Sequence, residues 1–406
     1  AEGPIYSSHR FLSLIEDTDS TQVLAHSRGL DKERYEITGK APVSTVCNNH
    51  VAEALLAHGV GEEHAEVLVS QREIVDGMPV QERSKNPVYI VKGADNNLRA
   101  VKFVISPEEA MVETIVNYYF SRHPVLRTYI PKSDMSSPVE LMINSAPVYL
   151  TVQEYVHDDG FDRLLKGSQQ EFNKYLSYWM KALAQIHVYG TEIMEELHVQ
   201  KKAQSPVRNK DEERIALCFP TIKIVGDYEL RQELVQLGVL EGRDFIHQDP
   251  KLSNRRGRKI IDWGNSGWGE GLLDVVRVLS DYNVQEARTL SEGDYKRCIV
   301  EYLTEKRRLV GDTSLLTRED IDHHYFRFNA IRTLLFQSMC GDCFSKEGRT
   351  NKGDILNAQF MLTQIPLLEA DCRQALREGT PRQYNLAAFR GERSSSGLYI
   401  PSTVYH

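Results

Sequence analysis

The chain is poor in cysteine and has no long hydrophobic run. Six cysteines in 406 residues are too sparse for a disulfide framework and are typical of a protein in a reducing compartment. No stretch approaches the ~18 consecutive apolar residues of a membrane span, and the N-terminal residues lack the basic and apolar regions of a signal peptide. We therefore expect a cytoplasmic protein with no membrane partner.

An excess of positive charge is also absent. The formal net charge is −8, so no overall positive field attracts phosphate backbones, and nucleic acid is not an expected partner. Hydrophobic residues make up 41% of the chain, which is enough to fill packed cores. At ~150 residues per domain, the length predicts two or three domains.

The first half of the chain carries the pattern of a small sheet with one helix. Residues 65–105 contain short runs rich in Val, Ile and Tyr, which predict a β-hairpin. A helix is predicted directly after it, because Ser106 is a good N-cap and Pro107 suits the first helical position. Further strands are predicted around Leu126–Ile130 and at Val148–Val156, with a loop rich in Ser and Pro between them.

The second half is mostly helical in pattern, over residues 157–379. The charged segment Gln200–Arg214 is either a solvated connection or a flap beside a substrate, and residues 380–406 are predicted to form an extended tail. Residues 1–64 are predicted to be a partly helical N-terminal extension. One buried helical face is predicted from residues at i, i+3, i+4 and i+7 spacing: Phe172, Tyr175, Leu176, Trp179, Met180, Leu183 and His187.

One interruption of the helical pattern carries chemistry. Residues 247–254 read H-Q-D-P-K-L-S-N, and a tight basic turn and the apolar pair Ile260-Ile261 lead from them to D-W-G. This pattern matches what phosphoryl transfer to a hydroxyl requires. Asp249 would orient the attacking hydroxyl, while Asn254 and Asp262 would hold Mg²⁺ on the nucleotide phosphates. A lone H-x-D is more often a structural pair, but the joint pattern is far more specific.

With these motifs the sequence resembles the aminoglycoside phosphotransferase and choline kinase superfamily, whose loop often reads H-G-D-x-x-x-x-N and whose metal motif often reads I-D-W. Gln248 stands where that family usually has Gly, and the link from Asn254 to Asp262 is shorter. The resemblance implies that Asp274 braces the loop through hydrogen bonds to its backbone, with His247 as a second supporting residue. It also implies a bilobal, protein-kinase-like α+β fold, with a small antiparallel sheet and one helix in the N-lobe and a mostly helical C-lobe.

A kinase-like N-lobe needs a strand lysine for the α- and β-phosphates of ATP. Lys102, at the centre of the strand R-A-V-K-F-V, resembles the lysine of the V-A-I-K strand of kinases. Its ion-pair partner should be a glutamate of the following helix. Glu109 and Glu113 are four residues apart and share a face, so spacing leaves both open, with a preference for Glu113 because it lies deeper in the helix.

The same resemblance predicts how the nucleotide base is held. The strand that ends near residue 156 resembles the hinge of the superfamily, whose backbone binds adenine. A G-x-G-x-x-G signature is missing before Lys102, and Gly77–Asn86 occupies the corresponding place in the chain. The residues predicted to hold the base are Gln153, Glu154, Tyr155 and Val156.

The predicted organisation is an ATP-binding N-lobe with its hinge at residues 65–156 and a C-lobe at 157–379. The expected reaction is ATP- and Mg²⁺-dependent transfer of the γ-phosphate to a hydroxyl of a small molecule, such as a sugar, polyol, amino alcohol, nucleoside or antibiotic.

A Ser/Thr protein kinase is an alternative, because Lys251, a second candidate catalytic residue, also occurs in protein-kinase loops. Against it, no A-P-E follows Asp262. A non-catalytic nucleotide-binding scaffold is a further alternative, although every reacting side chain is present.

The acceptor is left open by the sequence. Carboxylates would suit a polycationic antibiotic, and aromatic residues would suit a quaternary ammonium. The C-lobe offers the carboxylates Glu292, Asp294, Glu301, Glu305, Glu319, Asp320 and Asp322 and the aromatic residues Tyr282, Tyr295, Tyr302, Tyr325, Phe326, Phe328 and Phe336.

Overall fold

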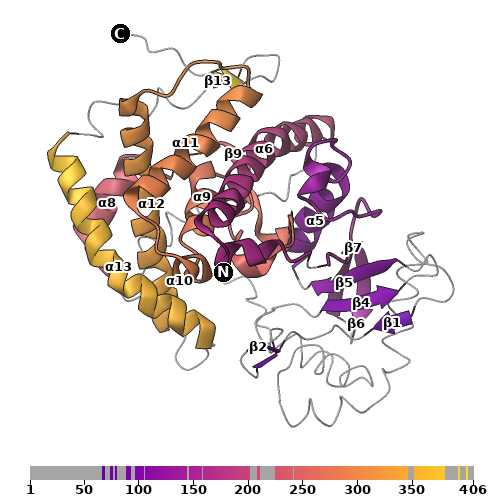
Figure 1. Ribbon diagram of the computed structural model, residues 1–406. Coiled ribbons are helices and arrows are strands. Elements are labelled where there is room, and N and C mark those ends of the chain that lie inside the picture. The colour runs from indigo at the N-terminus through magenta and orange to yellow at the C-terminus, as the bar shows by residue number, and fades with distance from the viewer. Residues whose placement is uncertain are drawn as a thin grey trace. The chain divides into compact units, whose positions relative to one another are not determined.

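The computed structural model divides the chain into two compact units, residues 1–157 with 261–264 and residues 158–260 with 265–406 (Figure 1). The predicted extension at 1–64 lies outside the described residues, as do most of Gly77–Asn86 and of Gln200–Arg214. The structure describes residues 66–68, 74–75, 78–79, 88–92, 97–104, 106–143, 146–157, 159–201, 208–210, 225–240, 242–345, 352–379, 392–393 and 399–400.

The first unit contains a five-stranded antiparallel sheet with the order β1-β4-β5-β7-β6. Strands β4 and β5 form the predicted hairpin, in which Val88 lies opposite Lys102. On its other side β5 pairs with β7, where Lys102 lies opposite Thr151. Because two neighbours hold β5, its register and the direction of Lys102 are fixed. The strands are β1 (Glu66–Leu68), β4 (Val88–Lys92), β5 (Leu98–Val104), β6 (Val139–Ile143) and β7 (Ala146–Glu154), with a separate ribbon of β2 (Ile74–Val75) and β3 (Met78–Pro79).

Helix α5 (Pro107–Ile115) begins where the sequence predicts. The side chain of Ser106 accepts a hydrogen bond from the backbone N–H of Glu109 at 3.2 Å, and Pro107 occupies the first turn. The helix continues into a π-helical turn, Val116–Phe120. It packs against β5 and β7. The buried apolar residues of this helix–sheet layer are Ala110, Val112, Ile115, Val116 and Phe120 from the helix and Val101, Val104, Leu150 and Val152 from the strands.

The predicted strand around Leu126–Ile130 is wrong. Leu126–Thr128 is a 3₁₀ helix, and the strand that pairs with β7 is β6, which comes from a segment predicted as a loop. Nδ1 of His123 accepts hydrogen bonds from two backbone N–H groups at the start of this turn, each at 3.3 Å. Leu126 and Ile130 are both buried and stand four residues apart, so the apolar spacing is helical and not alternating.

The second unit is mostly helical. Helix α6 (Gln169–Lys201) carries the predicted stripe, whose residues from Phe172 to His187 are all fully buried. It packs against α9 and α11, and α12 packs against α13. The further helices are α8 (Tyr228–Gln236), α9 (Gly271–Leu279), α10 (Tyr282–Ala287), α11 (Glu292–Leu309), α12 (Arg318–Ser345) and α13 (Lys352–Arg377). No helix among the described residues is long and apolar enough to cross a membrane.

Short strands frame the H-x-D segment. Strand β9 (Asp244–Ile246) leads into it and pairs with β12 (Gly267–Gly269), which also pairs with β8 (Arg208–Asn209). After the segment, β10 (Arg255–Arg256) and β11 (Lys259–Ile260) form the predicted tight hairpin. In the region predicted as an extended tail, β13 (Glu392–Arg393) pairs with β14 (Tyr399–Ile400).

Candidate active site

In the first unit, Lys102 lies between two carboxylates. Its Nζ is 2.9 Å from Oε2 of Glu113 and 2.5 Å from Oδ1 of Asp262. Glu113 is almost fully buried, with 3% of its side chain exposed, whereas 44% of the Asp262 side chain is exposed. Of the two glutamates that spacing left open, the structure therefore brings Glu113 to Lys102, while Glu109 lies against Gly264.

The charge of Lys102 is set by this pair of carboxylates. Burial by itself lowers the pKa of the ammonium, but attraction to Asp262 and Glu113 and hydrogen bonds to both outweigh burial and raise it above its ordinary value. Lys102 is therefore positively charged at neutral pH. One ammonium between two carboxylates leaves an excess of negative charge, which a divalent cation at the exposed oxygen of Asp262 would offset.

The D-W-G segment is seated on α5 and the turn that continues it. Trp263 is fully buried, with its ring centroid 6.1 Å from that of Phe120. A Cβ on Gly264 would approach Cβ of Glu109 to 3.3 Å, so only glycine fits this contact without a shift. Asp262 has a φ of +67°, a left-handed conformation that Asp tolerates better than most residues. Packing of Trp263 and Gly264 thus holds the backbone that directs Asp262 toward Lys102.

The predicted hinge, 153–156, comprises the last two residues of β7 and the two residues that follow it. The side chain of Gln153 accepts a hydrogen bond from Asn117 at 2.6 Å, and so faces α5 and its continuation. The N–H groups of Glu154 and Tyr155 already donate to backbone carbonyls, at 2.7 and 3.0 Å. Within the part of the chain that the structure describes, Val156 is the first hinge residue whose N–H forms no backbone hydrogen bond.

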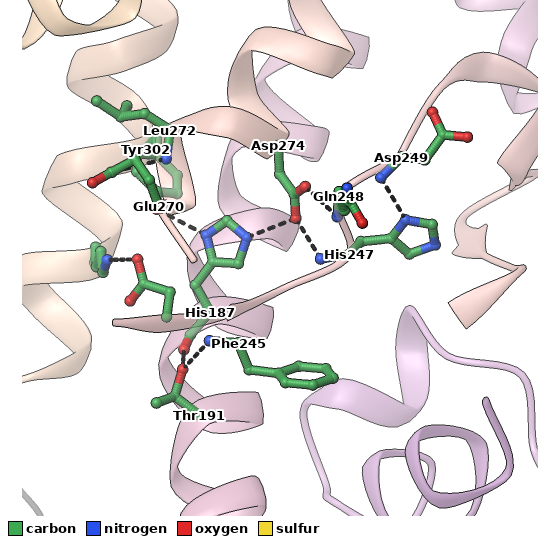
Figure 2. A network of polar contacts seen from close by, with 12 residues as sticks. His187, Thr191, Phe245, His247, Gln248, Asp249, Glu270, Leu272, Asp274 and Tyr302 are labelled. Atoms are coloured by element: carbon green, nitrogen blue, oxygen red, sulfur yellow. Dashed lines mark hydrogen bonds and ion pairs between the residues drawn. The ribbon is translucent and has the colours of Figure 1, made fainter. Parts of the chain in front are cut away.

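In the second unit, the H-x-D loop surrounds the carboxylate of Asp249 with donors. Lys251 places its Nζ 3.0 Å from Oδ2 of Asp249. Nδ2 of Asn254 donates to the Asp249 backbone carbonyl at 2.8 Å and to Oδ2 at 3.3 Å. The N–H of Asp249 donates to Nδ1 of His247 at 3.2 Å, as Figure 2 shows. A guanidinium nitrogen of Arg277 contacts the other oxygen, Oδ1.

Asp274 ties the start of this loop to α9. It is fully buried, and it accepts hydrogen bonds from the N–H groups of His247 and Gln248, both at 2.7 Å (Figure 2). Nε2 of His187, on α6, lies 3.0 Å from the same carboxylate, and its Nδ1 lies 2.8 Å from the hydroxyl of Tyr302 on α11. Three helices therefore hold the two backbone amides that precede Asp249.

Sequence reasoning missed three residues of this arrangement. The sequence predicts His187 only as part of the buried face of its helix, and Tyr302 only as a candidate acceptor contact. One sequence feature could have indicated Arg277: it follows Asp274 by three residues on the same helix, so the two side chains share a face.

Gln248 has a φ of +75°, and this strained position is the one usually occupied by glycine in the superfamily that the sequence resembles. A left-handed conformation costs a residue with a side chain ~1–2 kcal/mol, whereas glycine adopts it freely. We expect Gln248→Gly to leave stability unchanged or to raise it by up to ~1 kcal/mol, measured by urea unfolding. The control is Ala370→Gly in the exposed interior of α13, which should lose ~1 kcal/mol. Equal losses in both variants would contradict the strain at Gln248.

Most of the candidate acceptor residues have structural roles. The aromatic residues Tyr295, Tyr302, Phe326, Phe328 and Phe336 are buried in the core, with at most 5% of their surface exposed. The carboxylates that form ion pairs with basic side chains of α11 and its neighbours are Glu292, Asp294, Glu301, Glu305, Asp320 and Asp322.

No family model and no curated protein matches the chain. Among solved structures, it matches choline kinase LicA from Streptococcus pneumoniae with 13% identity over 79% of this chain and 99% of that one, at a TM-score of 0.43. An ethanolamine kinase from Plasmodium vivax matches with 14% identity, 84% and 96% coverage and a TM-score of 0.45. Aminoglycoside 2′-phosphotransferase-IIIa in its GDP complex matches with 14% identity, 81% and 99% coverage and a TM-score of 0.45.

These solved structures are small-molecule kinases of the superfamily that the sequence resembles.

Proposed function

We propose that the chain is an Mg²⁺- and ATP-dependent phosphotransferase that transfers the γ-phosphate to a hydroxyl of a small molecule. The observation that supports this most strongly is Lys102, a strand lysine 2.9 Å from Glu113 on a helix and 2.5 Å from Asp262. A purely structural lysine gains little from such burial, because removing the charge from water offsets most of the attraction. An ammonium held by two carboxylates is, by contrast, what binding of polyphosphate requires.

The first unit would bind the nucleotide and the second the acceptor, as in the bilobal kinase-like fold that the sequence predicts. Lys102 would bind the α- and β-phosphates, with Glu113 holding its ammonium in place. The base would lie at Gln153–Val156, with the N–H of Val156 as donor and backbone carbonyls as acceptors. The choice of Val156 as donor is supported by the hydrogen bonds that the N–H groups of Glu154 and Tyr155 already donate to backbone carbonyls.

The H-x-D loop and the D-W-G segment each contain an oxygen ligand suited to Mg²⁺. Asp262 offers an exposed carboxylate oxygen. Nδ2 of Asn254 donates a hydrogen bond to the backbone carbonyl of Asp249. The side-chain carbonyl oxygen of Asn254 is therefore the atom that it could offer to a cation. When bound, Mg²⁺ would neutralise charge on the phosphates. That Asn254 and Asp262 share one ion stays a prediction.

Asp249 would orient the acceptor hydroxyl and accept its proton as the oxygen bonds to the γ-phosphorus and the bond to the β-phosphate oxygen breaks. Lys251, at 3.0 Å from Oδ2 of Asp249, would hold that carboxylate and neutralise charge on the transferred group. His247 and Asp274 would act as positioning residues, because they fix the backbone that carries Asp249.

The test is ATP consumption by the full chain with Mg²⁺ over a panel of sugars, polyols, amino alcohols, hydroxy acids, nucleosides and antibiotics, with a Ser/Thr peptide mixture included. We expect one small-molecule class to raise ATP turnover at least ~10-fold above buffer. Phosphorylated peptide would favour the protein-kinase alternative. Tight Mg-ATP binding with no stimulated turnover would favour the scaffold, and absence of nucleotide binding would refute the proposal.

A further inference from the structure

Arg255 directly follows Asn254, and its side chain is anchored in the core of the second unit. Only 1% of the residue is exposed. Nη1 donates a hydrogen bond to the hydroxyl of Tyr175 on α6 at 2.7 Å. The guanidinium carbon also lies 5.5 and 5.4 Å from the ring centroids of Tyr175 and Trp179. A long side chain therefore ties the backbone after Asn254 to α6.

The carboxylate of Asp281 faces the same guanidinium from the start of α10. Its Oδ1 accepts the N–H of Asn283 at 2.9 Å and so caps the helix. Its Oδ2 accepts the backbone N–H of Leu252 and lies 3.6 Å from Nη2 of Arg255. Capping needs only the first of these oxygens. The second holds the loop at two points, one before and one after Asn254.

Asn254 lies between these two anchors. Residues Leu252–Asn254 form a 3₁₀ turn, in which the N–H of Asn254 donates to the carbonyl of Lys251 at 2.9 Å. Asn254 itself is 7% exposed. Contacts that fix the chain on both sides restrict the backbone from which its side chain extends. Asp274 does the same for the start of the loop, where it holds the two amides that precede Asp249.

A purely structural role does not account well for the pair of Arg255 and Asp281. Nε and Nη2 of Arg255 are buried and form no hydrogen bond with any residue that the structure describes. Taking a guanidinium and a carboxylate out of water is costly, and apolar residues at such sites often give equal or greater stability. An ion pair at 3.6 Å offsets only part of that cost. What the pair does supply is a fixed geometry on both sides of Asn254.

We propose that Arg255 and Asp281 are positioning residues for Asn254 as a ligand of Mg²⁺, just as Asp274 positions Asp249. The inference rests on the proposed phosphotransferase function and on the assignment of Asn254 within it. Neither Arg255 nor Asp281 would touch the metal or the substrate. Loss of either anchor should raise the Mg²⁺ concentration that nucleotide binding requires.

The test measures binding of a nonhydrolysable ATP analogue to the full chain by calorimetric titration at a series of Mg²⁺ concentrations. No acceptor is needed. We expect Arg255→Gln and Asp281→Asn each to raise the Mg²⁺ requirement at least ~10-fold, because residues that support a metal ligand typically contribute ~10–100-fold to metal affinity. Saturating Mg²⁺ should restore the affinity of the wild type for the analogue. A merely structural role would instead lower the number of binding sites per chain and leave the Mg²⁺ requirement unchanged.

The matched control is Arg258→Gln in the hairpin that follows the loop. The side chain of Arg258 is 59% exposed, lies 3.7 Å from Asp159 and stacks over the ring of Phe161 at 5.2 Å. The change therefore removes the same charge and a similar aromatic contact, but no anchor beside Asn254. Its Mg²⁺ requirement should stay within about twofold of the wild type, since exposed ion pairs contribute little.

A double-variant cycle tests whether Arg255 acts through Asn254. Asn254→Ala removes the proposed ligand oxygen and should itself raise the Mg²⁺ requirement. In that background Arg255→Gln should add no further rise, because the group that it positions is already absent. A full additional rise would contradict the inference.

An unchanged Mg²⁺ requirement in Arg255→Gln, or an equal rise in Arg258→Gln, would also overturn it. If Arg255→Gln fails to fold, Asp281→Asn decides, because Asn keeps an acceptor for the N–H of Leu252 and removes only the charge that faces Arg255. The wild type separates this inference from the function on which it rests. Failure of the analogue to bind refutes the phosphotransferase, whereas Mg²⁺-dependent binding that is weakened by Asn254→Ala but not by Arg255→Gln refutes only the positioning role.

Discussion

Asp249→Asn is expected to lower turnover by at least ~10²-fold while the affinity for Mg-ATP changes little. The carboxylate would act on the attacking hydroxyl and not on the nucleotide, and loss of a positioned general base typically costs 10²–10⁴-fold in rate. Asn retains the size of the side chain and can still accept a hydrogen bond from Asn254. The measurement is kcat on the acceptor found in the panel, together with the Kd of a nucleotide analogue.

A matched control for this change is Asp322→Asn, which removes the charge of an aspartate on α12 that pairs with Lys296 and is 42% exposed. Its turnover should remain within about twofold of the wild type, since exposed ion pairs contribute little. Near-normal turnover in Asp249→Asn would remove Asp249 from the chemistry and leave the H-x-D loop as a structural element.

Lys102→Met is expected to lower turnover by at least ~10²-fold and also to reduce stability. The charge on the phosphates is lost, and the buried carboxylate of Glu113, 3% exposed, loses its cation. Breaking a buried pair by removing one partner costs about 3–5 kcal/mol. The pKa of Lys102 is raised, so the stability it contributes is fully present below the unfolded pKa, near ~10.4, and is lost only as the pH rises beyond that value. At neutral pH the variant therefore loses all of the stability that the charge of Lys102 contributes.

The double variant Lys102→Met with Glu113→Gln separates stability from function. Removing both members of the pair should restore most of the unfolding free energy, because no buried carboxylate remains without its cation, but it should not restore turnover. Lys132→Met is the control, as Lys132 is 62% exposed and pairs with Asp134 at 3.1 Å. Turnover that recovers together with stability in the double variant would show that Lys102 acts only on the fold.

Local patterns in the sequence were sufficient for the elements around the site. The hairpin of β4 and β5, the Ser106 cap of α5 and the buried stripe of α6 each depend on neighbours within a few residues, and each is present. The prediction for Leu126–Ile130 is wrong because the β-branched and aromatic residues of this segment favour a strand. Capping by His123 and the burial of Leu126 and Ile130 on one helical face decided otherwise.

The sequence by itself determined which residue types the site contains, because the offsets of His247, Asp249 and Asn254 lie within one loop and Lys102 lies at the centre of one strand. Only the tertiary structure decided the partners. Glu109 and Glu113 share a helix face, and packing of α5 against β5 and β7 brings Glu113 to Lys102.

The longer-range contacts follow the same rule. Asp262 reaches Lys102 across 160 positions of the chain, and Arg277 reaches Asp249 across 28. Periodicity specifies the direction of a side chain relative to its own helix or strand, but not which distant side chain it meets. That depends on how the elements pack, and so the ion pairs of Lys102 and Arg277 were decided by the tertiary structure alone.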